Sequence, residues 1–245
     1  MFRLIILSLL LAVVTYFNHS GGDKTPLREP SLVKLNMHLT QPRTHSAPSS
    51  LNASGITLQD GTLSFSSVEF LGSRRDKSEF HFTSSLSQPY HLQADITHVS
   101  LVEFDVPAGR YRSAKIILHA TQQDSLPAMT VHALLQGKHD KKPVPLEIRF
   151  FDFPQVLSLP IHTQEKEGLL VFPRQGFSNL QIRIDPMQLF DPGMMDQLRE
   201  ATMQVTPSGR KVILSREHNA HIHTRLAGNV HQSIQALLKQ GPNRL

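Results

Sequence analysis

The chain has 245 residues, enough for one large all-β domain or two small ones, and an apolar share of 39%, enough for a real core. It has no cysteine, which excludes disulfides, thiol catalysis, iron–sulfur clusters, cysteine–zinc sites and a cysteine-linked lipid anchor. The net charge of +5 comes from scattered residues, and aromatic residues are few, so we expect no nucleic-acid partner. A weak attraction to anionic lipid or polysaccharide stays open.

The first 22 residues are predicted to be a secretory signal peptide or an N-terminal membrane anchor. Arg3 precedes an apolar run, Leu4–Val14, and the small residues 20–22 suit a cleavage site. The run is shorter than the roughly 20 apolar residues that usually span a membrane. Residues 23–30 are expected to form a linker.

Export of a chain without cysteine fits a bacterial protein of the periplasm or cell surface. If the segment is not cleaved, we expect residues 4–17 to tether the protein to the inner membrane, and this would be its one contact with the membrane.

Strand patterns follow at intervals of about ten residues. Residues 31–40 alternate between apolar and polar side chains, which predicts a half-buried strand, and residues 41–55 have the composition of a loop. Asp60-Gly61 is predicted to be a two-residue hairpin turn. Further turns are expected at Arg74–Lys77 and at Val106–Gly109. The later expected strands are 111–120, 129–138, 144–153, 154–161, 168–174 and 178–185.

The C-terminal part has a helical character. Residues 185–202 contain two Asp-Pro starts, which predict short helical turns before a strand at 210–215. An amphipathic helix is expected to begin with Asn219 as its N-cap and to stop at Gly241-Pro242. Its apolar stripe is Ile222, Leu226, Val230, Ile234 and Leu237 or Leu238.

These patterns predict a mainly β protein. We expect residues 31–240 to form one antiparallel β-sandwich, immunoglobulin-like or transthyretin-like, with the C-terminal helix docked on it. Residues 241–245 are expected to be a disordered tail.

Four histidines in residues 215–232 raise the question of a metal site. His218 and His221 share a helical face, whereas His221 and His223 lie about 200° apart. His223 falls near the apolar stripe and His231 away from His221. We therefore expect histidines that flank a helix, and a metal site at His218 and His221 remains the alternative.

The sequence contains no motif of a known catalytic site. There is no nucleophile elbow, phosphate loop, dinucleotide fingerprint or zincin motif. Five acids near strand ends are expected to be ordinary exposed carboxylates: Glu147, Asp152, Glu165, Glu167 and Asp185. We predict no catalytic, cofactor-binding or metal-binding residue and no cofactor.

Several elements occur together in a familiar order: a turn with Pro107, Gly109 and Tyr111, an Asp185-Pro186 followed by Phe190, and a strand, Val212–Ser215, before Asn219. In this the chain resembles an uncharacterised family of bacterial envelope β-sandwich domains that often occur in lipoproteins. The resemblance implies a sandwich in the envelope and brings no catalytic residues. The chain departs from the lipoproteins in lacking the anchoring cysteine.

The sequence therefore favours a non-catalytic exported envelope protein, a binding or structural module whose partner is a protein, a polysaccharide or a lipid surface. Two alternatives remain. One is a periplasmic metal-binding protein that uses its surface histidines, and the other is a hydrolase whose site is assembled from loops.

Overall fold

The computed structural model describes residues 30–39, 55–86, 89–93, 98–121, 126–136, 142–151, 153–163, 169–190 and 192–240. The predicted leader, most of the linker, the loop at 41–54 and the tail at 241–245 lie outside these residues. No helix in the described ranges is long and apolar enough to cross a membrane.

The described chain is mainly β, as predicted. Its elements are β1 (Pro30–Leu39), β2 (Ile56–Arg74), β3 (Glu79–Ser85), β4 (Pro89–Gln93), β5 (Val99–Pro107), β6 (Gly109–Ala120), β7 (Met129–Leu135), β8 (Val144–Phe150), β9 (Val156–Thr163), β10 (Leu170–Phe172), β11 (Phe177–Ile184), η1 (Pro186–Leu189), η2 (Pro192–Met194), α2 (Met195–Arg199), β12 (Met203–Thr206), β13 (Gly209–Leu214), α3 (Ala220–Ser233) and β14 (Ile234–Gln240).

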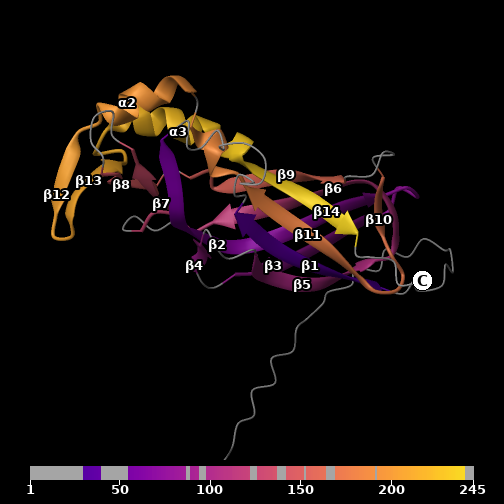
Figure 1. Ribbon diagram of the computed structural model, residues 1–245. Helices are drawn as coiled ribbons and strands as arrows, with labels where there is room; N and C mark the ends of the chain where they lie inside the picture. The colour runs from indigo at the N-terminus through magenta and orange to yellow at the C-terminus, as the bar shows by residue number, and fades with distance from the viewer. Residues whose placement is uncertain are drawn as a thin grey trace, which may run out of the picture.

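The strands form one large mixed sheet in the order β12-β13-β8-β7-β2-β6-β9-β14-β11-β1-β5, and this sheet is curled (Figure 1). The long strand β2 belongs to two parts of this sheet. Its first part pairs with β7 and β4, and its second part pairs with β6 and β3. We call the part from β12 to the start of β2, with β4, the helix-covered half. The rest, from β3 and the end of β2 to β5, is the half-barrel.

The predicted β-sandwich is not confirmed, and the prediction that all strands are antiparallel is wrong. Three strand pairs are parallel, β1 with β11, β13 with β8, and β14 with β9. Alternation along a strand shows that one face is buried, but it does not say whether a second sheet or the same curled sheet covers that face. The spacing of the runs therefore predicted many of the strands, but not β4, β12 or β14, and it left the partners of the strands undetermined.

Aromatic rings fill the interior of the half-barrel. Phe70 on β2 lies at their centre, with ring centroids 5.6 Å from Phe104 on β5, 5.8 Å from Phe172 on β10 and 6.3 Å from Tyr111 on β6. At the edges of the curled sheet, Phe82 on β3 stacks on Phe104 at 4.3 Å. These contacts hold the curl because each edge-to-face or offset pair adds to the apolar burial.

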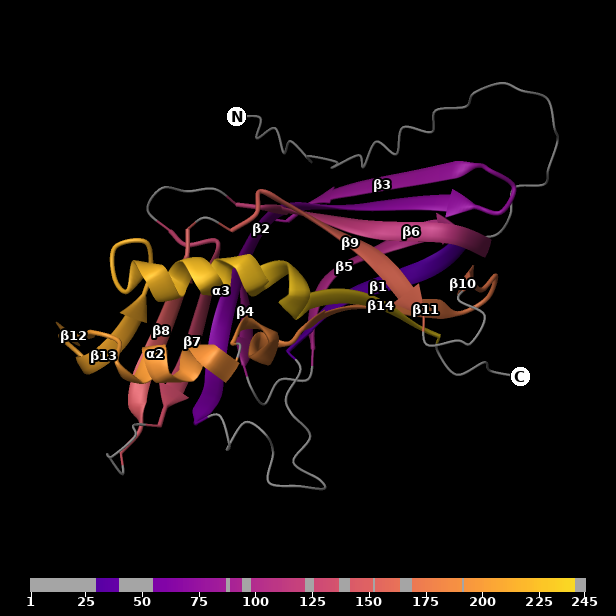
Figure 2. The ribbon, with the colours of Figure 1, turned by 90° about the horizontal axis from the view of Figure 1, so that it is seen from above.

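The helices α2 and α3 cover one face of the helix-covered half (Figure 2). Ile222, Leu226 and Val230 of α3 are buried, as the predicted stripe requires. The helix nevertheless ends at Ser233, not at Gly241-Pro242. Ile234 takes extended angles, φ −123° and ψ 127°, and starts β14, which lies between β11 and β9. Apolar residues four apart fit a strand as well as a helix, so the stripe alone could not set this boundary.

The predicted turn at Asp60-Gly61 is wrong. Both residues lie inside β2, next to a bulge between Leu58 and Asp60. Gly61 pairs with Val131 on β7, and a Cβ at Gly61 would lie 2.9 Å from the carbonyl oxygen of Thr130. The glycine is therefore needed for a close approach of two strands, and a turn is not formed there.

The other two turns are found where the sequence predicts them. Arg74–Lys77 joins β2 to β3, with Lys77 at φ 69°. Between β5 and β6, Gly109 has φ 142°, a region that favours glycine. The hydroxyl of Tyr111 donates a hydrogen bond of 2.8 Å to the carbonyl of Pro107 and fixes this second turn.

Gly72 gives a test of the packing. A Cβ there would lie 2.6 Å from the ring of Tyr111, so we expect Gly72→Ala to lower the free energy of unfolding by about 1–3 kcal/mol. A Cβ at Gly228 in α3 would meet nothing within 4 Å, so Gly228→Ala should raise the free energy of unfolding by about 0.5–1 kcal/mol. Urea unfolding measures both. Equal effects of the two variants would contradict this packing.

Candidate functional site

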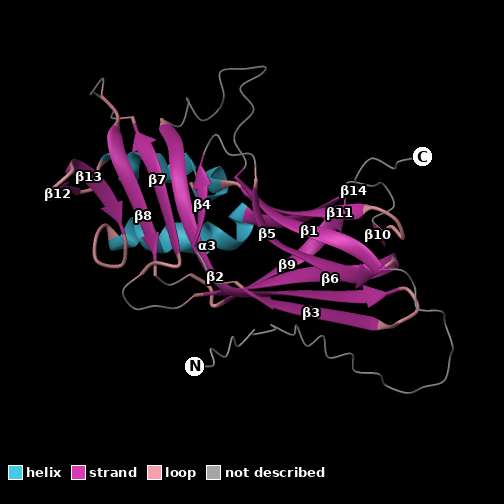
Figure 3. Ribbon diagram, turned by 90° about the horizontal axis from the view of Figure 1, so that it is seen from below, coloured by secondary structure: helices cyan, strands magenta, loops and turns pink. Residues whose placement is uncertain are grey.

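The helix-covered half leaves one face of its sheet uncovered (Figure 3). Successive side chains of a strand point to opposite faces, so the residues between the buried ones lie on this side. We call this surface the open face. It is formed by Asp60 and Thr62 of β2, Thr130 and His132 of β7, Glu147 and Arg149 of β8, and Lys211 of β13.

Glu147 is the centre of an ion-pair cluster on the open face. Its side chain is 13% exposed, accepts a hydrogen bond from Arg149 Nε at 2.5 Å, and is paired with Lys211 Nζ. Burial alone would raise the pKa of Glu147, but the hydrogen bonds from Lys211 and Arg149 outweigh it and hold the pKa below its usual value. The carboxyl is therefore ionised at neutral pH and cannot act as a general acid.

His132 and Asp60 form a second pair on the same face. His132 Nδ1 lies 2.5 Å from Asp60 Oδ1. A carboxylate on Nδ1 is also how a hydrolase orients its catalytic histidine, whose Nε2 must then reach a hydroxyl. Among the described residues, no hydroxyl is hydrogen-bonded to Nε2 of His132. Within the described ranges, the pair therefore has no nucleophile beside it.

A third cluster lies on the outer wall of the half-barrel. Glu69 on β2 bridges two histidines, with His119 Nε2 2.6 Å from one carboxylate oxygen and His81 Nε2 2.9 Å from the other. The hydrogen bond from His119 lowers the pKa of Glu69, burial opposes it, and His81 lowers it further. Because each ring occupies a different oxygen, the carboxylate separates the two nitrogens. No group of three or more His, Cys, Asp or Glu side chains in the described ranges is placed to hold a metal ion.

The histidines of the 215–232 segment diverge, as the helical spacing predicts. His223 is 3% exposed, donates from Nε2 to the carbonyl of Arg149 at 2.9 Å and packs on Phe150. Burial lowers its pKa, partly opposed by that hydrogen bond. His221 and His231 are exposed. The metal hypothesis for His218 and His221 stays a prediction.

Asn219 precedes α3 but does not cap it through its side chain. It has φ 53°, and its amide nitrogen donates to the carbonyls of Ile213 at 2.8 Å and Thr202 at 3.1 Å. Its oxygen accepts from the backbone N–H of Thr202 at 2.9 Å. Asn219 is therefore the N-cap residue, as predicted, but its side chain does not bond to the helix and instead ties the start of α3 to β13 and to the residue before β12.

The acids named in the sequence analysis have different surroundings in the structure. Glu147 was expected to be an ordinary exposed acid, and this is wrong, because two cations from β8 and β13 enclose it. Asp185, after β11, accepts a hydrogen bond from Gln188 at 3.3 Å. Asp152, Glu165 and Glu167 lie outside the described residues.

Sequence reasoning missed most members of these clusters. His132, the partner of Asp60, lies 72 residues away in the chain, and the two partners of Glu69 lie 12 and 50 residues away, on strands whose pairing the sequence does not state. One local signal existed: Glu147 and Arg149 are two residues apart, which places them on one face of a strand.

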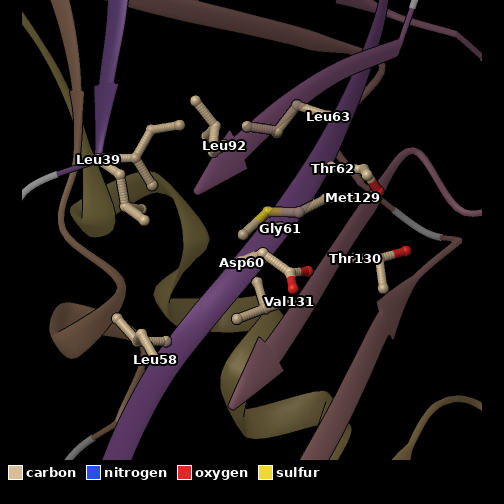
Figure 4. Close-up of a pocket in the computed structure, with 11 residues that line it drawn as sticks. Leu39, Leu58, Asp60, Gly61, Thr62, Leu63, Leu92, Met129, Thr130 and Val131 are labelled. Carbon is tan, nitrogen blue, oxygen red and sulfur yellow. The ribbon is translucent and has the colours of Figure 1, made fainter. Parts of the chain in front are cut away.

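A pocket lies where the two parts of the sheet meet (Figure 4). It has about 300 Å³ of empty space, part of it open to solvent. Its lining is mostly apolar, with Leu39, Leu92 and Ile184 from β1, β4 and β11. Asp60 is the one ionisable side chain in the lining, and it is bonded to His132. In Figure 4, its carboxylate and the hydroxyl of Thr130 lie across β2 from Leu39 and Leu92.

Comparison with known proteins gives no relative: no protein-family model, curated protein or solved structure matches the chain.

The Glu147 cluster predicts a stability effect with a defined pH dependence. Glu147→Gln leaves two cations without their carboxylate, so we expect a loss of about 1–3 kcal/mol in the free energy of unfolding at neutral pH. The pKa of Glu147 lies below 4.5 in the folded state, so its contribution is present above pH 4.5 and is lost as the pH falls through the folded pKa. Urea unfolding across this range measures both effects.

Glu103→Gln is the matched control. Glu103 pairs with Lys34 at 3.1 Å, but both side chains are well exposed, at 49% and 37%. We expect a loss below about 1 kcal/mol. A loss from Glu147→Gln no larger than that from Glu103→Gln would contradict the structural role given to the cluster.

His223 predicts a second loss of stability with falling pH, in the range below pH 6.5. Its folded pKa lies below the 6.5 of the unfolded chain, so the unfolded state binds more protons and stability falls as the pH falls below 6.5. His223→Gln keeps a donor for the carbonyl of Arg149 but does not titrate. The variant should lose less stability than the wild type between about pH 7.5 and about pH 5.5. Equal losses, measured by urea unfolding, would overturn this assignment.

Proposed function

We propose that this protein is a non-catalytic exported protein of the bacterial envelope that serves as a binding or structural module. The observation that carries the proposal is the state of the ionisable side chains. The pairs and clusters built on Asp60, Glu69 and Glu147 are satisfied by partners on neighbouring strands. These groups are committed to holding strands together, which argues against a role as acids, bases or nucleophiles.

The described pocket supports the same proposal. A catalytic site needs a nucleophile, a base and a group that stabilises developing charge, all converging on a reacting atom. The pocket offers one carboxylate, already paired with His132, among mostly apolar side chains. The envelope location, the bacterial origin and the resemblance to envelope domains rest on the N-terminal sequence and the quoted motifs, and they belong to this proposal.

The alternative of a metal-binding protein has one additional supporting observation. Besides His218 and His221, the two histidines on Glu69 bring a pair of imidazoles and a carboxylate together on the surface. A metal ion would have to displace both hydrogen bonds to use them, since the carboxylate now lies between the rings. We rank this function below the non-catalytic one for that reason.

We expect the purified protein to hydrolyse no ester, glycoside or peptide of a substrate panel faster than a blank. The physical reason is that, among the described residues, no hydroxyl is hydrogen-bonded to Nε2 of His132. The measurement is release of product from chromogenic substrates. Turnover that is lost in His132→Ala would overturn the non-catalytic proposal and establish the loop-built hydrolase instead.

Titration with zinc and copper(II) by calorimetry separates the metal-binding alternative. We expect no stoichiometric sub-micromolar binding. Tight binding lost in His81→Ala/His119→Ala would assign a metal to the Glu69 cluster, and tight binding lost in His218→Ala/His221→Ala would assign it to the start of α3. Either result would replace the proposed function.

A further inference from the structure

One end of the half-barrel gathers turns that are far apart in the sequence. The start of β1 lies beside the end of β5, because Pro30 pairs with Pro107. Gly109 pairs with Phe172 at the end of β10, and the N–H of Arg75 donates to the carbonyl of Arg110 at 3.1 Å. We call this end the distal rim and define it as residues 74–79, 107–112 and 173–177.

The distal rim is basic. Five of its side chains are exposed cations without an ion pair among the described residues: Arg75, Lys77, Arg110, Arg112 and Arg174. The rim holds two carboxylates, Asp76 and Glu79, and Asp76 lies 3.7 Å from a further cation, Arg74. The surface therefore carries more positive than negative charge, unlike the open face, where cations and carboxylates are paired.

An apolar side chain accompanies these charges. Phe177, at the start of β11, is 43% exposed, and Lys34 Nζ lies 5.3 Å from the centre of its ring. Lys34 also pairs with Glu103 at 3.1 Å, so the net positive charge of this end comes from the rim cations. An exposed aromatic ring on a basic surface is a combination that suits the head-group region of a membrane.

The chain enters the described structure at this same end. Pro30 starts β1 at the distal rim, and the apolar run predicted as a leader or anchor ends at Val14. The 15 residues between them can span about 55 Å at most. If the run stays in a membrane, this connection keeps the distal rim near the lipid surface, where a weak attraction becomes effective.

We propose that the distal rim docks on a membrane surface of anionic phospholipids. The cations face the lipid phosphates, Phe177 reaches the interface, and the helix-covered half points away from the bilayer. This inference rests on the proposed export of the chain, and it adds a lipid surface as the partner. It also extends the expected membrane contact beyond residues 4–17.

Partitioning of the full chain onto vesicles tests the proposal. One set of vesicles is phosphatidylcholine alone, and the other is an equal mixture of phosphatidylcholine and phosphatidylglycerol. Insertion of the apolar run contributes to binding on both kinds of vesicle. The excess, the ratio of the partition coefficient on mixed vesicles to that on phosphatidylcholine alone, therefore reports the effect of charge. Each cation near an anionic surface is worth about fivefold in partitioning. Lys77→Gln/Arg110→Gln should therefore lower the excess by about 25-fold, and added salt should lower it for the wild type.

Lys142→Gln/Arg210→Gln is the matched control, because it removes the same charges from exposed positions in the helix-covered half. We expect this variant to change the excess by less than about threefold, because charges beyond a Debye length are screened. Equal losses in the two variants, or no preference of the wild type for the mixed vesicles, would overturn the proposal.

Binding to dextran sulfate provides a further outcome. If Lys77→Gln/Arg110→Gln weakens that binding and leaves vesicle binding unchanged, the rim recognises an anionic polysaccharide and the lipid proposal is wrong. Failure of vesicle binding with no hydrolysis and no tight metal binding would remove the docking inference alone. Hydrolysis of a panel substrate would remove the proposed function whatever the vesicles show.

Discussion

The continuity of β2 is the constraint on which the rest of the structure depends. This 19-residue strand pairs first with β7 and β4 and then with β6 and β3, so one segment fixes the register of both parts of the sheet. Two glycines allow its neighbours to come close: Gly61 faces the backbone of β7, and Gly72 faces the ring of Tyr111. A Cβ at Gly61 would push away the neighbouring strand β7, and a Cβ at Gly72 would clash with the ring of Tyr111.

The second consequence of this arrangement is the placement of α3 and β14. The chain leaves β13, the strand next to the edge strand β12, crosses the helix-covered half as α3, and returns as β14 in the middle of the half-barrel. Asn219 and His223 hold this crossover, one through the carbonyl of Ile213 and the other through that of Arg149. The histidine-rich segment that suggests metal binding is thus the connection that joins the two parts of the sheet.

Charge is distributed differently on the strand surfaces and at the distal rim. On the open face and in the Glu69 cluster, carboxylates pair with basic side chains of neighbouring strands, and these partners lower the pKa values of Glu147 and Glu69. At the distal rim, cations from three separate turns accumulate with fewer carboxylates between them. The first pattern stabilises the sheet, and the second leaves a surface free to attract an anionic partner.

The sequence by itself determined the elements whose signals are local. Alternation predicted β1. The charged turn after β2 and the glycine turn before β6 lie where they were expected, and the apolar stripe predicted the buried face of α3 correctly up to Ser233. Only the tertiary structure decided the curl of the sheet, the parallel pairs, the strand β14 and the partners of Asp60, Glu69 and Glu147. The reason is that a strand's sequence specifies which face is buried but not which strand lies beside it. The same limit explains the basic rim, whose residues are scattered along the chain and meet only because three turns end on one side of the half-barrel.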